Sequence, residues 1–98
     1  MIYLIAYDIK SDDIRLKIAK RLVAEGYERI QFSVFVGLKN PKKNKILWNN
    51  LNLWLKNEPL SKFYIIPLTH SNFKNITMIG KNNIDIDYML GIKETMFI

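Results

Sequence analysis

Two amphipathic segments alternate with short strand-forming runs along this chain, and this order limits its fold more than any other feature. The strand-forming runs are residues 2–8, 28–38 and 63–68, which are rich in β-branched and aromatic residues. Between them, residues 12–25 and the segment that begins at Pro41 carry apolar side chains at helical spacing. This order predicts an α+β domain of the ferredoxin-like type, β-α-β-β-α-β, with both helices on one face of a mostly antiparallel sheet.

The helical segments have recognisable ends. Ser11 is a candidate N-cap for the first helix, which is expected to stop at Gly26. Pro41 is expected to open the second helix, because proline is tolerated at an early helical position.

The strand-forming runs also carry local signals. Alternation changes phase near Phe32 and Ser33, so residues 28–38 are expected to kink or to form two short strands that meet at a tight bend. Pro67 limits the last of these strands to a sheet edge or a strand end.

The rest of the chain has no third amphipathic helix to cover the other face of the sheet. Residues 73–79 alternate and predict a further short strand, and the apolar tail from Asn83 onward must pack on something. We expect one domain over residues 1–98, in which residues from about 80 to 98 form a dimerisation or partner-binding tail with an extra C-terminal strand. The uncovered face would meet solvent, nucleic acid or a second copy, and its apolar content favours a homodimer.

The composition narrows the chemistry. Apolar residues make up 49% of the 98 residues and charged residues 24%, a globular balance. Fifteen Lys and Arg against nine Asp and Glu give a net charge of +6, which favours a polyanionic partner such as nucleic acid. The absence of cysteine excludes disulfides, thiolate metal sites and a cysteine nucleophile, and it is compatible with the cytoplasm. The first apolar run is too short to span a membrane, so we expect no membrane partner.

Asp8 is the first candidate for a chemical role. A carboxylate at the end of a buried strand can hold a hard cation, but it can equally cap the following helix. One carboxylate per chain is a poor magnesium site, whereas a two-fold dimer would bring two copies of Asp8 to one ion. Their mutual repulsion would couple dimerisation to metal binding.

Basic side chains could bind phosphates near that acid. Arg15 and Lys17 lie early in the first helix, where they either clamp phosphates or form an ordinary solvated face. Arg29 begins an apolar strand and needs a partner, which could be Glu28, Asp8 or a phosphate.

Several uncharged residues near these side chains have a structural and a functional interpretation. Tyr7 is expected to point away from Asp8 and to pack in the core. Ser33 could bond a phosphate or a water, while Phe35 could stack on a base or fill an interface, and we favour filling. His70 is the only histidine and is expected in a polar loop.

Three segments in this order resemble the small CRISPR-associated nuclease family, the second core protein of spacer acquisition. Residues 1–9, with Tyr7-Asp8-Ile9, resemble the family's opening strand and its acid, and residues 11–20 resemble its first helix. Residues 29–37, Arg-Ile-Gln-Phe-Ser-Val-Phe-Val-Gly, resemble its most specific motif. The clear match covers roughly the first 40 residues.

The resemblance implies a ferredoxin-like homodimer that hydrolyses phosphodiester bonds with a divalent metal, usually magnesium. Asp8 would be the catalytic, metal-binding acid, shared across the dimer. Arg15, Arg29 and Phe35 occupy positions where the family places functional residues. Lys17 stands where an arginine is common, which puts bidentate phosphate contact there in doubt. The resemblance implies supporting roles for two further residues, Tyr7 and Ser33.

The same resemblance implies an assembly role in antiviral defence. In the acquisition complex, the dimer would bridge two pairs of integrase subunits while duplex DNA lies across its surface. A catalytically idle DNA-binding scaffold is therefore an alternative to an active endonuclease on RNA or DNA. A toxin-type ribonuclease of the same fold is a third possibility.

Overall fold

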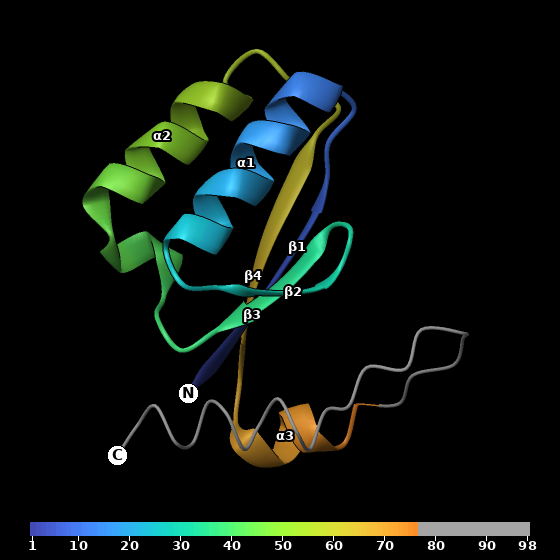
Figure 1. The fold of residues 1–98 in the computed structure, drawn as a ribbon, viewed down its shortest axis with the longest axis vertical. Helices are drawn as coiled ribbons and strands as arrows, with labels where there is room; N and C mark the ends of the chain where they lie inside the picture. The colour runs from blue at the N-terminus through green and yellow to red at the C-terminus, as the bar shows by residue number, and fades with distance from the viewer. Residues whose placement is uncertain (77–98) are drawn as a thin grey trace.

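A four-stranded antiparallel sheet forms the centre of the computed structural model, which describes residues 1–76 (Figure 1). The elements are β1 (Ile2–Asp8), α1 (Asp12–Ala24), β2 (Glu28–Gln31), β3 (Val34–Gly37), the short 3₁₀ turn η1 (Pro41–Lys43), α2 (Lys45–Leu55), β4 (Lys62–Leu68) and α3 (His70–Lys74). The strand order β2-β3-β1-β4 places β1 and β3 in the middle of the sheet. This arrangement confirms the predicted ferredoxin-like α+β fold.

The helix ends follow the local sequence. The Ser11 hydroxyl accepts a hydrogen bond from the Ile14 amide, and Gly26 follows α1 with a φ of +92° that glycine tolerates best. The second helix differs from the prediction. Pro41 opens the 3₁₀ turn η1, and Asn44 is the cap of α2 proper because its side-chain oxygen accepts from the Leu47 amide.

The central run folds back on itself as its change of phase predicts. β2 and β3 are separated by a turn at Phe32 and Ser33, and the pairing of β2 with β3 shifts register between Arg29 and Gln31. β4 lies at an edge of the sheet, as Pro67 predicts. Proline has no N–H to donate to a neighbouring strand, and an edge strand has a neighbour on one side only.

The main core lies between the sheet and the two long helices. Ile5 pairs with Phe35 of β3 on one side and with Ile65 of β4 on the other, so these three side chains share the face under the helices. The buried residues of this core are Ile5, Tyr7, Ile9, Ile18, Ala19, Leu22, Tyr27, Phe35, Leu47 and Leu51. Figure 1 shows α1 and α2 side by side over this face.

The short helix α3 lies on the opposite face of the sheet. Its Phe73 is buried against Ile2 and Val36, whose side chains alternate away from the main core. The prediction of a strand over residues 73–79 was wrong for its first residues, because Thr69 caps a helical turn by accepting from the Asn72 amide. The expectation that no helix lies on this face was wrong for the same reason.

The remainder of that face is open. Tyr64 and Ile66 of β4 are exposed there, and Asp8 lies on the same face at the end of β1. We call this exposed part of the sheet, formed by Asp8, Tyr64 and Ile66, the open face. The predicted C-terminal strand and the tail from about 80 to 98 lie outside the described residues.

Candidate functional site

Asp8 ends β1 on the open face, in register with Lys62 of β4. Its side chain is 63% exposed, and its Oδ1 lies 3.3 Å from Nζ of Lys10. An ion pair so exposed contributes little to stability. The helix-capping role considered for Asp8 was wrong, since Ser11 supplies the cap. The carboxylate is therefore available to an external ligand.

The fit of a divalent cation depends on a second carboxylate. Within residues 1–76, no group of three or more His, Cys, Asp and Glu side chains comes together to hold a metal ion. Asp8 offers hard oxygen donors of the kind that magnesium prefers, but a single carboxylate is too few protein ligands for a hydrolytic metal site. Because Asp8 is exposed on the open face, a second copy packed there could supply the other carboxylate.

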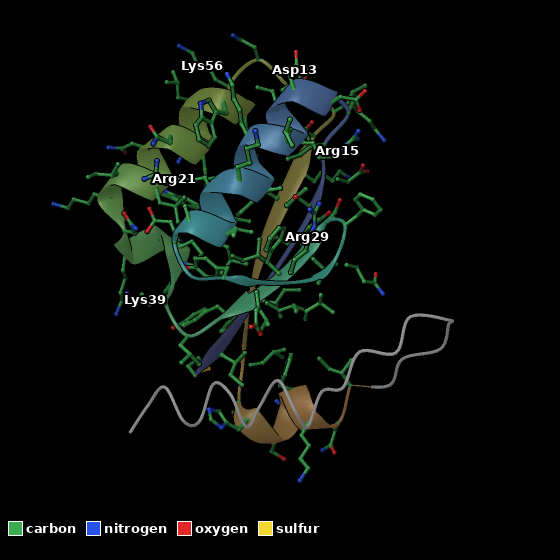
Figure 2. All side chains as sticks on the ribbon, viewed as in Figure 1. Asp13, Arg15, Arg21, Arg29, Lys39 and Lys56 are labelled. Atoms are coloured by element: carbon green, nitrogen blue, oxygen red, sulfur yellow. The ribbon has the colours of Figure 1, made fainter. Side chains whose placement is uncertain are left out.

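Arg15 and Arg29 lie on the side of the molecule where the β2–β3 hairpin turns (Figure 2). Arg15 donates from Nη1 to the Ile9 carbonyl at 3.0 Å, and its Nη2 pairs with Asp12. Arg29 donates from Nε and Nη2 to the Phe32 carbonyl, at 3.2 and 2.6 Å. The partners considered for Arg29 in the sequence, Glu28 and Asp8, are thus not its partners in the structure.

Phe35 is fully buried beneath the helices, so its ring cannot reach a nucleobase. The expectation that it fills an interface was also wrong, because it fills the chain's own core. Its ring stacks on Tyr7 with centroids 6.2 Å apart, and Phe63 stacks on the other side of Tyr7 at 6.0 Å. These contacts confirm the core role predicted for Tyr7.

The Tyr7 hydroxyl reaches the same turn as Arg29. It donates to the Phe32 carbonyl at 3.4 Å. Burial raises the pKa of Tyr7, and the nearby charges of Arg29 and Arg15 lower it in part. A tyrosine hydroxyl is protonated at neutral pH even at its ordinary pKa, and the upward shift of the Tyr7 pKa preserves that state. Tyr7 therefore acts as a hydrogen-bond donor to the turn.

Three further residues singled out in the sequence lie in the β2–β3 turn, on α1 and at the start of α3. Ser33 lies in the β2–β3 turn, where its carbonyl accepts from the Tyr7 amide at 3.1 Å. Lys17 is exposed on α1, which leaves its predicted phosphate contact open to test. His70 is the first residue of α3, so its assignment to a loop was wrong.

Sequence reasoning missed two features of this region. Phe32 is 84% exposed at the tip of the turn, and Lys10 and Lys62 flank Asp8. The change of phase at Phe32 was a usable signal, because an apolar residue at a bend has no strand face to join. Lys62 is placed beside Asp8 by strand register, which the sequence alone does not give, whereas Lys10 is only two residues from Asp8 along the chain and was a usable signal.

Comparison with protein families identifies the chain. The family model described as CRISPR associated protein Cas2 matches residues 1–76. The chain belongs to the Cas2 family. The resemblance seen in residues 1–9, 11–20 and 29–37 is thereby confirmed. A curated Cas2 relative from Archaeoglobus fulgidus, named CRISPR-associated endoribonuclease Cas2 1, is 27% identical over 93 residues, which are 95% of this chain and 98% of the relative.

Solved structures support the same Cas2 fold. The crystal structure of Streptococcus pyogenes Cas2 at pH 6.5 superimposes with a TM-score of 0.64 and 20% identity, covering 82% of this chain and all of that one. A chain of a partial Cas6-RT-Cas1–Cas2 complex superimposes with a TM-score of 0.53 and 26% identity, covering 80% of this chain and 83% of that one. Among residues 1–76, none of the helices has the length and apolar character needed to cross a membrane.

Proposed function

We propose that this Cas2 protein is a magnesium-dependent endonuclease that works as a homodimer within the CRISPR spacer-acquisition complex of the cytoplasm. The observation that carries the proposal is the exposed Asp8 carboxylate at the end of β1 on the open face. The endoribonuclease name of the Archaeoglobus relative supports hydrolysis of phosphodiester bonds.

The open face supplies the reason for a dimer. Tyr64 and Ile66 expose apolar surface on the same face as Asp8, and burying that surface against a second copy is favourable. In a two-fold dimer the same patch meets itself, so each Asp8 approaches its twin if the axis passes near the end of β1. Two facing carboxylates repel each other and gain from a cation between them.

The two Asp8 side chains would hold the magnesium ion, since no group of three or more His, Cys, Asp and Glu side chains forms an alternative site within residues 1–76. When bound, a divalent ion polarises a phosphoryl oxygen and makes a hydroxide available near neutral pH. Arg29 and Arg15, with Lys17 on the exposed side of α1, are proposed to bind the phosphates of the substrate.

The defining experiment removes and restores the metal. Purified protein is incubated with labelled single-stranded RNA or duplex DNA in magnesium and then in EDTA. We expect cleavage in magnesium, its loss in EDTA and its recovery when magnesium is returned in excess. Cleavage that continues in EDTA would contradict metal dependence, and no cleavage of either substrate would contradict the nuclease proposal.

The dimer is tested by placing a charge on the open face. Ile66 is 39% exposed, and Ile66→Lys would bury a pair of charges at the proposed interface, so we expect the variant to sediment as a monomer. The matched control is Ile46→Lys on α2, where the side chain is 68% exposed on the helical side of the molecule. A dimer that tolerates Ile66→Lys as well as Ile46→Lys would place the interface elsewhere.

A second candidate function is a DNA-binding scaffold that bridges integrase subunits without cleaving. The net charge of +6 favours it, as does the likeness to a chain of a Cas1–Cas2 complex. If the scaffold role suffices, Asp8→Ala leaves spacer acquisition intact while magnesium-dependent cleavage is lost. Membership of the Cas2 family favours both acquisition roles over a toxin-type ribonuclease.

A further inference from the structure

The turn between β2 and β3 presents the most exposed large apolar side chain in residues 1–76. Phe32 is 84% exposed, with its ring in solvent. A single exposed apolar residue is common on protein surfaces and needs no explanation by itself. Phe32 differs because its carbonyl accepts several side-chain hydrogen bonds and the Arg29 guanidinium lies over its ring.

The backbone of the turn is fixed by hydrogen bonds from two side chains. The Phe32 carbonyl accepts from the Tyr7 hydroxyl and from both Nε and Nη2 of Arg29. The next carbonyl, that of Ser33, accepts from the Tyr7 amide. A ring mounted on such a turn loses little conformational freedom when a ligand stacks on it.

Arg29 supplies a positive charge beside the ring. Its guanidinium carbon lies 5.2 Å from the Phe32 ring centroid and 5.4 Å from that of the buried Phe35. Within residues 1–76 no carboxylate forms an ion pair with Arg29, and its Nη1 makes no hydrogen bond. The guanidinium is therefore positioned by the turn but not neutralised by it.

We propose that Phe32 is a stacking platform for an unpaired nucleobase and that Arg29 binds the phosphate beside that base. Proteins bind single strands by this pairing of an exposed aromatic ring with a cation. The inference rests on the proposed function, because the turn lies near the proposed metal site: the Tyr7 hydroxyl bonds to the Phe32 carbonyl, and Asp8 is the next residue of β1. A substrate strand would pass around the end of the sheet, from the turn to the open face.

The surroundings of Phe32 favour a nucleobase over an apolar protein partner. Its neighbours along the chain are Gln31 at the end of β2 and Ser33 in the turn, and Arg29 flanks the ring. A protein interface of useful affinity needs a wider apolar patch than one ring among polar groups. A single base stacked on a single ring needs no wider patch.

The test measures binding in EDTA, so it does not depend on cleavage. Fluorescence anisotropy is recorded with a short labelled single-stranded RNA and with a blunt RNA duplex of the same sequence. We expect Phe32→Ala to weaken single-strand binding roughly 5- to 100-fold and to leave duplex binding within about twofold. Phe32→Trp should retain single-strand affinity, whereas Phe32→Leu should not, because leucine is apolar but cannot stack. Ile46→Ala, another exposed apolar residue, is the control and should bind as the wild type does.

An abasic scan of the RNA identifies the stacked base. Removing that one base should weaken binding to the wild type about as much as Phe32→Ala does, and should have no further effect on the variant. This non-additivity is the signature of a direct contact between ring and base.

Three results for the Phe32 variants would overturn the inference: unchanged single-strand affinity in Phe32→Ala, rescue by leucine as complete as by tryptophan, or weaker binding explained by a dissociated dimer. The first two are read from the titrations and the third from sedimentation of the variant. A wild-type protein that binds no single-stranded RNA would overturn it as well. If the wild type binds but does not cleave in magnesium, the nuclease proposal fails while the stacking proposal stands on the binding data.

Discussion

Asp8→Ala is expected to lower the rate of magnesium-dependent cleavage at least about 100-fold, since even the loss of a group that merely orients a metal ligand costs 10- to 100-fold. In the proposed dimer, one substitution removes both carboxylates from the shared ion. The rate of RNA cleavage is measured at several magnesium concentrations, in order to separate weaker metal binding from a slower reaction.

The fold of the variant should be unchanged. The Asp8 side chain is 63% exposed and its ion pair with Lys10 is exposed to solvent, so the melting temperature should match that of the wild type. Binding of RNA in EDTA should not fall, because the substitution removes a negative charge near the proposed path of the phosphates.

Asp13→Ala is the matched control for this experiment. Asp13 is also an exposed acid, but it lies in the first turn of α1 and not on the open face. We expect its variant to cleave at the wild-type rate. If Asp8→Ala cleaves as fast as Asp13→Ala does, Asp8 is not the metal-binding acid.

The local structure of this chain could be predicted well from its sequence. The bounds of β1, the Ser11 cap, the bend at Phe32 and the edge position of Pro67 all depend on contacts close in sequence or on backbone chemistry. The opposite orientation of Tyr7 and Asp8 followed from strand alternation, and the structure confirms it.

The errors arose where long-range packing decides the outcome. Alternation places Phe35 on one face of the sheet, but only the position of α1 and α2 shows that this face is the buried one. The partner of Arg29 depends on where the turn carbonyl points after the bend. The first residues of the strand predicted over 73–79 belong to the helix α3 instead. In so short a segment the one buried side chain, Phe73, fits both the alternating pattern of a strand and the spacing of a helix, so the pattern could not separate the two.

The buried ring of Phe35 holds the sheet and the helices together. Phe35→Ala should lower the free energy of unfolding by about 3–5 kcal/mol, because the ring is fully buried and the cavity cannot collapse between sheet and helices. A domain of this size has a total stability of only about 5–15 kcal/mol. The melting temperature should therefore fall by roughly 15 °C or more, as measured by circular dichroism at a fixed protein concentration.

Phe35→Leu separates packing from a direct role of the ring. Leucine keeps much of the buried volume but loses the stack on Tyr7, so its melting temperature should lie between those of the wild type and Phe35→Ala. Below its melting temperature, Phe35→Leu should bind single-stranded RNA with near wild-type affinity, in contrast to Phe32→Leu. A Phe35→Leu protein that is folded yet binds as weakly as Phe32→Ala would show that the motif aromatic contacts the substrate. The buried position of its ring argues that the family motif acts here by supporting Arg29 and the turn from beneath.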